Sequence, residues 1–195
     1  MKQAAAAVGQ CRMMHIYDKL FSEYNRSVAQ ILLTGDDVED PSRAEHLRST
    51  FSALLEMGVI PVVNENDSVS SAEIETGRHK VLGDNDTLSA IVAELCRADL
   101  LVLLSDIDGL YNKDPRTNPD AALIHRVDAL TPEILEMAGG AGSWRGTGGM
   151  ATKLSAARIA MNAGCDMVIT NGERMEDIYD IVAGKDIGTR FLARR

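Results

Sequence analysis

GTGGMATK, residues 146–153, is a glycine-rich turn that runs directly into a helix. Its glycines lack a Cβ, so their backbone N–H groups can approach a bound anion closely. Apolar residues follow at helical spacing from Leu154 to Met161, and Gly164 is placed to end the helix. Unpaired N–H groups and the helix dipole both favour negative charge at such a turn. This stretch therefore predicts a phosphate site, with Lys153 one turn into the helix as its cation.

The residues of the turn leave other interpretations open. Thr152 stands where the commonest phosphate loop has a glycine directly before its lysine. The relaxed dinucleotide pattern G-x-G-x-x-A does fit, through Gly146, Gly148 and Ala151. That pattern belongs directly after a strand, whereas residues 138–145 are small and glycine-rich. From the residues alone, the turn is a phosphate site, a dinucleotide site or a plain helix cap.

The composition is that of a globular domain with an acidic charge balance. The 195 residues are 45% hydrophobic and 25% charged, and their formal net charge is −9. This balance argues against nucleic acid and anionic membranes as partners, and no apolar run has the length of a bilayer span. The three cysteines are scattered and lack CxxC spacing, so we expect reduced thiols and a cytoplasmic protein.

Helical and strand patterns alternate along the chain. We expect helices over 1–24, 41–57, 86–96, 154–164 and 175–182, another beginning at Pro132, and strands over 28–34, 59–63, 100–104, 123–127 and 167–170. Residues 68–80 read as a protruding hairpin or flap. Because the central strands are continuous apolar runs, the pattern predicts an α/β sandwich with a mainly parallel sheet in one domain.

Three clusters of polar side chains stand at the boundaries of these segments. Asn64-Glu65-Asn66-Asp67 comes after one apolar strand, Gly83-Asp84-Asn85-Asp86 opens a helix, and Ser105-Asp106 ends another strand. Taken singly, each cluster is explained by helix or turn capping. Together they indicate a binding site, because α/β folds bind ligands at the carboxyl ends of their strands. Their carboxylates can hold an ammonium group or Mg²⁺.

These motifs resemble those of the glutamate 5-kinases, a branch of the amino acid kinase family. The resemblance is carried by residues 64–67, 83–86, 105–106, 109–111, 114–116 and 146–153, in that order, and it runs from Gly9 to Thr189. It implies a three-layer α/β/α fold with a mainly parallel central sheet. It also implies transfer of the γ-phosphoryl group of ATP, with Mg²⁺, to the side-chain carboxylate of L-glutamate. That reaction yields glutamyl 5-phosphate and begins proline biosynthesis.

The resemblance also implies roles for individual residues. Asp67 and Asn85 would grip the amino acid with Asp84 close by, Asp86 would orient the catalytic cations, and Lys153 would neutralise the transferred phosphoryl group. The nucleotide would be lined by Ser105, Asp106, Thr147, Gly148, Gly149, Met150, Ala151, Thr152 and Lys153. Metal ligands stay unassigned. Homo-oligomers and feedback inhibition by proline are family properties that follow from the resemblance only.

The chain departs from the family pattern at its start. The family domain normally opens with a strand that carries a Gly-Lys phosphate site, followed by a Ser/Gly substrate loop, and residues 1–195 begin after both. Nothing in the sequence corresponds to the PUA domain that some members carry. We therefore expect an N-terminally incomplete kinase domain over residues 1–195, with little activity by itself. The alternatives are a non-catalytic nucleotide-binding fragment and a dinucleotide-binding oxidoreductase.

Overall fold

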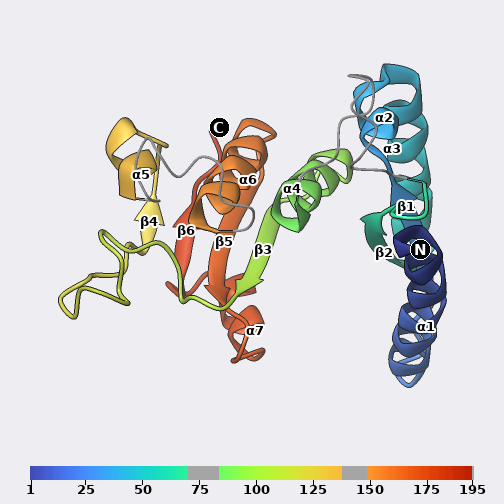
Figure 1. The fold of residues 1–195 in the computed structure, drawn as a ribbon, viewed down its shortest axis with the longest axis horizontal. Helices are drawn as coiled ribbons and strands as arrows, with labels where there is room; N and C mark the ends of the chain where they lie inside the picture. The colour runs from blue at the N-terminus through green and yellow to red at the C-terminus, as the bar shows by residue number, and fades with distance from the viewer. Residues whose placement is uncertain (70–83, 138–148, 195) are drawn as a thin grey trace. The chain divides into compact units, whose positions relative to one another are not determined.

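The computed structural model describes residues 1–69, 84–137 and 149–194. They belong to two compact units, Met1–Leu88 and Ser89–Arg195, which are described separately below (Figure 1). The prediction of a single domain over residues 1–195 stays a prediction.

The first unit pairs two parallel strands with helices. Its elements are α1 (Lys2–Ser22), β1 (Val28–Leu33), α2 (Gly35–Glu39), α3 (Pro41–Glu56), β2 (Ile60–Glu65) and the first turn of α4 (Asn85–Leu95). The pairing of β1 with β2 sets Val28 opposite Ile60. Helix α3 begins at an Asp40 cap, whose carboxylate accepts two backbone N–H groups at 2.9 Å, and Gly58 follows its end with a φ of +70°.

The second unit is built on a four-stranded sheet. After the rest of α4 come β3 (Leu100–Ser105), β4 (Arg126–Val127), α5 (Pro132–Met137), α6 (Met150–Asn162), β5 (Asp166–Asn171), α7 (Asp177–Val182) and β6 (Thr189–Phe191). The strand order is β3-β5-β6-β4, and only the β5–β6 pair is antiparallel among these strands.

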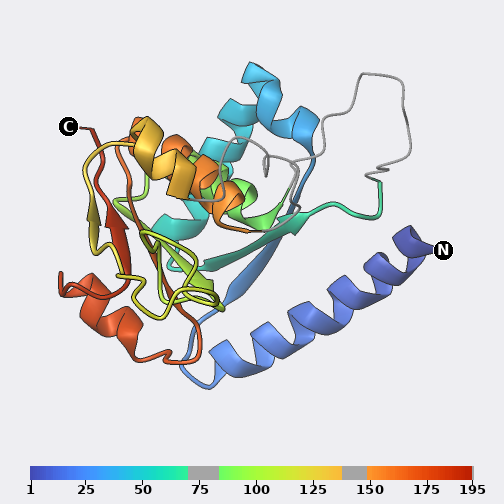
Figure 2. The same cartoon turned by 60° about the vertical axis from the view of Figure 1, so that its left-hand side comes forward.

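Helix α6 packs on this sheet (Figure 2). The face of the helix that does so is rich in alanine. Ala156, Ala157 and Ala160 are fully buried against core residues that include Met167 and Phe191. The short side chains let the helix backbone approach the strands closely. Gly149, the N-cap residue of α6, is therefore attached to a well-packed helix.

The predicted α/β class with mainly parallel strands is confirmed, with the described strands in two sheets, one in each unit. Strand β4 is shorter than the predicted 123–127, because Leu123 makes only an isolated bridge to Tyr111. The sequence analysis did not predict α2 or β6. The hairpin expected at 68–80 lies almost wholly outside the described residues. No helix in the described ranges is long and apolar enough to span a membrane.

Candidate active site

A cavity of about 370 Å³ opens in the second unit where β3 ends. Its walls come from the end of β3, the loop that follows, the end of α5 and the start of α6. The lining residues are Ser105, Asp106, Ile107, Leu110, Tyr111, Lys113, Asp114, Pro115, Arg116, Met137, Gly149, Met150 and Lys153. Five residues predicted to line a nucleotide are thus brought together at the carboxyl end of a parallel strand, the usual ligand position in α/β folds.

The start of α6, together with Gly149 before it, forms one wall of the cavity. Gly149 is the N-cap residue of α6 in an extended conformation, with a φ of −178°. Thr152 Oγ1 folds back onto this cap and donates a hydrogen bond to the Gly149 carbonyl at 2.8 Å. Gly149, Met150 and Lys153 line the cavity. Ala151 and Thr152 lie in the first turn of α6 but are not among the lining residues. Thr147 and Gly148 lie outside the described residues.

Charged side chains of both signs surround the opening. Lys113, Arg116 and Lys153 are lining cations, and Asp106 and Asp114 are lining carboxylates. The Arg116 Nη2 atom lies 4.0 Å from Asp106 Oδ2, and both side chains are largely exposed. Exposed pairs of this kind are weak, so a ligand phosphate can displace the carboxylate from the guanidinium at little cost. The cavity thus supplies local positive groups within a chain whose net charge is −9.

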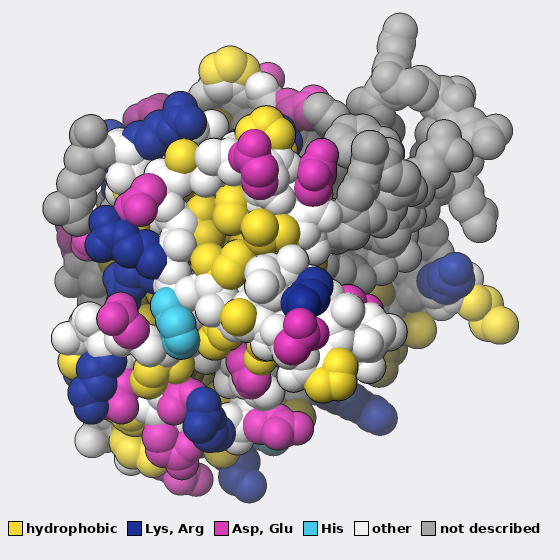
Figure 3. Space-filling view, turned by 90° about the vertical axis from the view of Figure 1, so that its left-hand side faces the viewer, with side chains coloured by type: hydrophobic (Ala, Val, Ile, Leu, Met, Phe, Trp, Pro, Cys, Tyr) yellow, Lys and Arg dark blue, Asp and Glu magenta, His cyan; other side chains and the backbone are white. Residues whose placement is uncertain are grey.

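The face of the molecule that carries α5 and β4 shows no large area of a single charge sign among the coloured residues. Figure 3 shows acidic and basic side chains interspersed there around a small apolar patch, as far as the coloured residues extend. Binding of an anionic ligand at the cavity would therefore depend on individually placed groups.

Tyr111 adds an aromatic wall that the sequence analysis quoted only as part of a motif. Its hydroxyl donates to Asp108 Oδ2 at 3.0 Å, and the other oxygen of Asp108 accepts from Asn171 Nδ2, also at 3.0 Å. Burial, followed by the hydrogen bond to Asp108 and its charge, raises the pKa of Tyr111. The phenol therefore stays protonated near neutral pH and continues to donate. The carboxylate of Asp108 links the loop after β3 to the end of β5.

The residues predicted to bind the amino acid lie in the first unit. Asp67 is exposed in the turn after β2. Asp84 Oδ1 accepts the backbone N–H of Thr87 at 2.8 Å, so Asp84 caps α4. Asn85 is exposed on the first turn of α4, and Asp86 is half-buried on the same turn. Capping thus accounts for the position of Asp84, and the substrate roles of all four residues stay predictions.

The described residues contain no group of three or more His, Cys, Asp or Glu side chains that could hold a metal ion. The carboxylates at the cavity, Asp106 and Asp114, are hard oxygen donors. Mg²⁺ commonly binds through one or two such carboxylates together with substrate phosphates, and it keeps several waters. This donor set fits a magnesium ion that arrives with a nucleotide.

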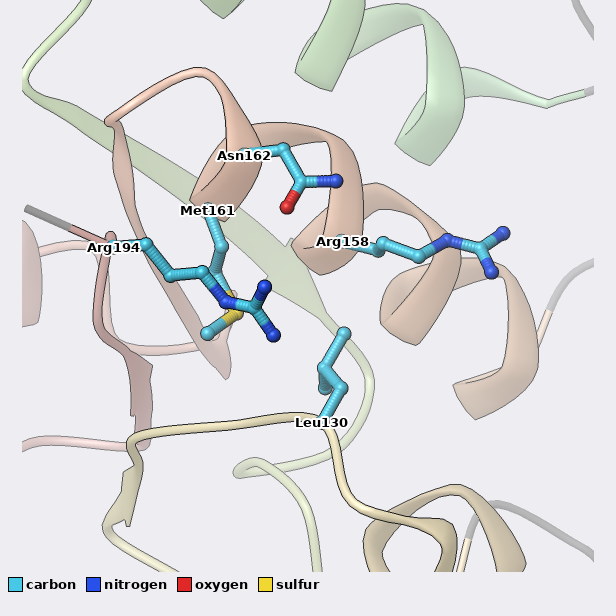
Figure 4. Close-up of a pocket in the computed structure, with 5 residues that line it drawn as sticks. All are labelled: Leu130, Arg158, Met161, Asn162 and Arg194. Carbon is cyan, nitrogen blue, oxygen red and sulfur yellow. The ribbon is translucent and has the colours of Figure 1, made fainter.

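A second cavity, of about 190 Å³, lies near the C-terminal end of α6 and is lined by Leu130, Arg158, Met161, Asn162 and Arg194 (Figure 4). In the close-up, the Arg194 guanidinium lies over Met161 and the Arg158 guanidinium points away from it. Both arginines are exposed. Cations near a helix C-terminus are already favoured by the helix dipole, so we assign no ligand to this cavity.

Comparison with known proteins gives consistent matches. Residues 1–171 match the model described as "Amino acid kinase family". The chain is 56% identical to the glutamate 5-kinase of Clostridium perfringens (strain 13 / Type A) over 194 residues, which are 100% of this chain and 71% of that protein. It is 51% identical over 194 residues to the glutamate 5-kinase of Listeria monocytogenes serovar 1/2a, covering 100% of this chain and 70% of that protein. The chain thus spans about 70% of the length of these relatives.

Solved structures match at the level of the fold. The UMP kinase from Bacillus anthracis superposes with a TM-score of 0.63 at 16% identity, over 93% of this chain and 64% of that one. The carbamate kinase from Giardia lamblia bound to AMP-PNP superposes with a TM-score of 0.64 at 16% identity, over 98% of this chain and 73% of that one. At this identity the likeness concerns the architecture alone.

Proposed function

We propose that this chain, which belongs to the amino acid kinase family and within it to the glutamate 5-kinases, transfers the γ-phosphoryl group of ATP to the side-chain carboxylate of L-glutamate. The product is glutamyl 5-phosphate, which begins proline biosynthesis. The observation that carries the proposal is the 56% identity to a glutamate 5-kinase across 194 residues. The cavity that gathers Ser105, Asp106 and Lys153 supports it independently.

The nucleotide half of the reaction belongs to the second unit. The ammonium of Lys153 and the positive end of the α6 dipole favour phosphate at the same wall of the cavity. Ser105 ends β3 and Asp106 follows it in the cavity lining, and the Tyr111 ring offers an apolar surface to the base or ribose. MgATP is the substrate form, since Asp106 and Asp114 suit the magnesium ion that its phosphates carry.

The amino acid half of the reaction belongs to the first unit. We assign Asp67 to the ammonium group of L-glutamate and the Asn85 amide to a carboxylate, because an amide can donate to a carboxylate without repelling it. Asp86 orients the catalytic cations. Asp84 acts through its cap on α4, which fixes the turn that carries Asn85 and Asp86.

The chemistry explains why no general base is needed. The attacking carboxylate of glutamate is already ionised at neutral pH, so no proton has to be removed. A glutamate oxygen forms a bond to the γ-phosphorus, and the bond between that phosphorus and the bridging oxygen breaks as ADP leaves. Positioning and charge neutralisation then account for catalysis, and Lys153 supplies the cation among the residues assigned here.

The test measures ADP release with MgATP and L-glutamate by a complete enzyme that carries this segment, since residues 1–195 alone are expected to have little activity. Hydroxylamine is present to trap the acyl phosphate as a hydroxamate. L-Aspartate, L-glutamine and D-glutamate are the matched substrate controls. We expect hydroxamate only with L-glutamate. ADP release without dependence on glutamate, or binding of NAD(H) in place of ATP, would contradict the proposal and favour the nucleotide-binding or oxidoreductase alternative.

Two further expectations complete the proposal. We expect the protein to form a homo-oligomer and to reside in the cytoplasm. Light scattering after gel filtration measures the first, and a monomer at micromolar concentration would exclude it. Fractionation of cells that express the protein checks the second.

A further inference from the structure

Thr189, the first residue of β6, is fully buried, and its hydroxyl joins two backbone segments that are remote in sequence. Thr189 Oγ1 accepts the Leu110 N–H at 2.8 Å and donates to the Ile124 carbonyl at 2.6 Å. The Leu110 carbonyl in turn accepts the Ile124 N–H at 2.8 Å. The Thr189 hydroxyl is therefore the hydrogen-bond partner of both the Leu110 N–H and the Ile124 carbonyl.

The residues that precede Leu110 and Thr189 are both glycines, and each lies too close to neighbouring atoms to carry a Cβ. A Cβ on Gly109 would lie 2.4 Å from Thr189 Oγ1, and a Cβ on Gly188 would lie 2.1 Å from the Ile169 carbonyl oxygen. Gly188 also has a φ of +66°, which L side chains rarely adopt. The strand that carries Thr189 is thus fixed tightly beneath the loop at residues 108–110.

That loop forms the wall of the larger cavity. Leu110 is only 1% exposed and lines the cavity, as does its neighbour Tyr111, whereas Thr189 does not. Tyr111 is held from its other end by the Asp108 carboxylate. We infer that Thr189 is a positioning residue for nucleotide binding, which acts by fixing the backbone of Leu110 and thereby the wall made by Leu110 and Tyr111. This inference rests on the proposed nucleotide site.

The chemistry of the side chain makes the inference specific. A hydroxyl donates and accepts at once, and serine keeps this ability while valine keeps the shape of threonine without it. In Thr189→Val, the Leu110 N–H and the Ile124 carbonyl lose their shared partner in a buried place. Leaving a buried backbone group without its hydrogen-bond partner changes an equilibrium by about tenfold. We expect the dissociation constant of MgADP to rise by about tenfold, and the KM for L-glutamate to stay unchanged.

The experiment compares wild type, Thr189→Val and Thr189→Ser, with Thr170→Val as the matched control. Thr170 is the other fully buried threonine among the described residues, and it does not line the cavity. Calorimetric titration with MgADP measures affinity, and hydrogen–deuterium exchange over residues 108–112 measures protection of the loop. We expect weaker binding and faster exchange in Thr189→Val alone, with serine restoring both.

The outcomes separate this inference from the proposed function. Absence of MgADP binding by wild type would overturn the proposed nucleotide site itself. A folded Thr189→Val variant that binds MgADP as wild type does would overturn only the role of Thr189. If the valine variant does not fold, serine decides: wild-type affinity in Thr189→Ser supports the hydroxyl, and a tenfold loss there assigns the effect to packing of the methyl group and overturns the inference.

Discussion

Replacing Lys153 by methionine removes a cation from the cavity wall and keeps most of the side-chain volume. Three cationic side chains and two carboxylates of the described residues line the cavity, so the variant takes the formal charge of this lining from plus one to zero. A hydrogen bond from an ammonium to a phosphate contributes about 1.5–3 kcal/mol, or roughly 10- to 150-fold in affinity. Since charge shifts within the transferring group in the transition state, we expect kcat to fall by about 100- to 1000-fold.

Two measurements check this prediction. Calorimetry gives the affinity for MgATP without glutamate, and a coupled assay of ADP release gives kcat at saturating substrates. Lys185→Met is the matched control, because Lys185 is exposed and pairs with Asp180 of α7 at 2.8 Å, away from the cavity lining. We expect the control to stay within about twofold of wild type. If Lys153→Met binds MgATP as tightly as wild type and turns over as fast, the cavity is not the phosphate site.

Three further predictions concern the substrate, the fold and the thiols. In a complete enzyme that carries this segment, Asp67→Ala should raise the KM for L-glutamate by about 10- to 100-fold and spare MgATP affinity, since an ammonium loses its partner. Steady-state kinetics with both substrates measure this, and an equal loss for both substrates would contradict it. Arg190→Met should cost about 1–3 kcal/mol in urea unfolding, because Arg190 lies 3.4 Å from Asp166 and donates to the Ile181 carbonyl at 2.9 Å; an unchanged midpoint would refute this. Burial, followed by the charges of Asp166 and Asp99, raises the pKa of Cys165 to about 11 from an ordinary 9.0, so this thiol should resist iodoacetamide at pH 8 while exposed Cys11 reacts, as mass spectrometry would show. The protonated thiol is the form that folding favours, so the associated stability is present below pH 9 and is lost as the pH rises through about 11.

The regular elements that were predicted correctly carry their signals locally. Helix α3 is bounded by an aspartate cap, a proline in its first turn and Gly58, and each of these acts within a few residues of its own position. Strand β3 is a continuous apolar run, so it is predicted as a strand without knowing which strand pairs with it. The resemblance to glutamate 5-kinases is likewise confirmed by relatives above 50% identity. It rests on several short motifs that occur in one order along the chain, and each of them is local in sequence.

The elements that were missed depend on distant partners or on a single side chain. Strand β6 has three residues and exists because it pairs with β5 on one side and β4 on the other. Helix α2 has five residues, and its start is held by the Asp37 carboxylate, which accepts from the N–H and the hydroxyl of Thr34. Neither segment is long enough to show a hydrophobic period. The local signal for α2 is the Thr34-x-x-Asp37 capping pattern, which alone does not show how far a helix extends.

The candidate site also combines features that local sequence predicts with contacts between residues far apart in the chain. The clustering of Ser105, Asp106 and Lys153 at one cavity agrees with the sequence analysis, because strand ends and helix starts are recognisable from composition. The contact of Thr189 with Leu110 spans 79 residues, and the sequence shows nothing that would pair them. The nucleotide roles of the residues at this cavity stay predictions. So do the assigned roles of Asp67, Asn85 and Asp86 and the expected low activity of residues 1–195 alone.

The two substrates of the proposed reaction make opposite demands on an acidic chain. L-Glutamate presents an ammonium group, which carboxylates such as Asp67 can hold in the ground state as well as in the transition state. The acceptor carboxylate and the γ-phosphate are both anionic, and at about 4 Å two like charges repel by roughly 4 kcal/mol at an effective dielectric constant of 20. A cation at this point therefore matters most when the two groups meet. We accordingly expect Lys153→Met to lower kcat more than MgATP affinity, and Asp67→Ala to change the KM for glutamate more than kcat. Equal effects of both substitutions on both constants would mean that neither residue contacts its assigned group.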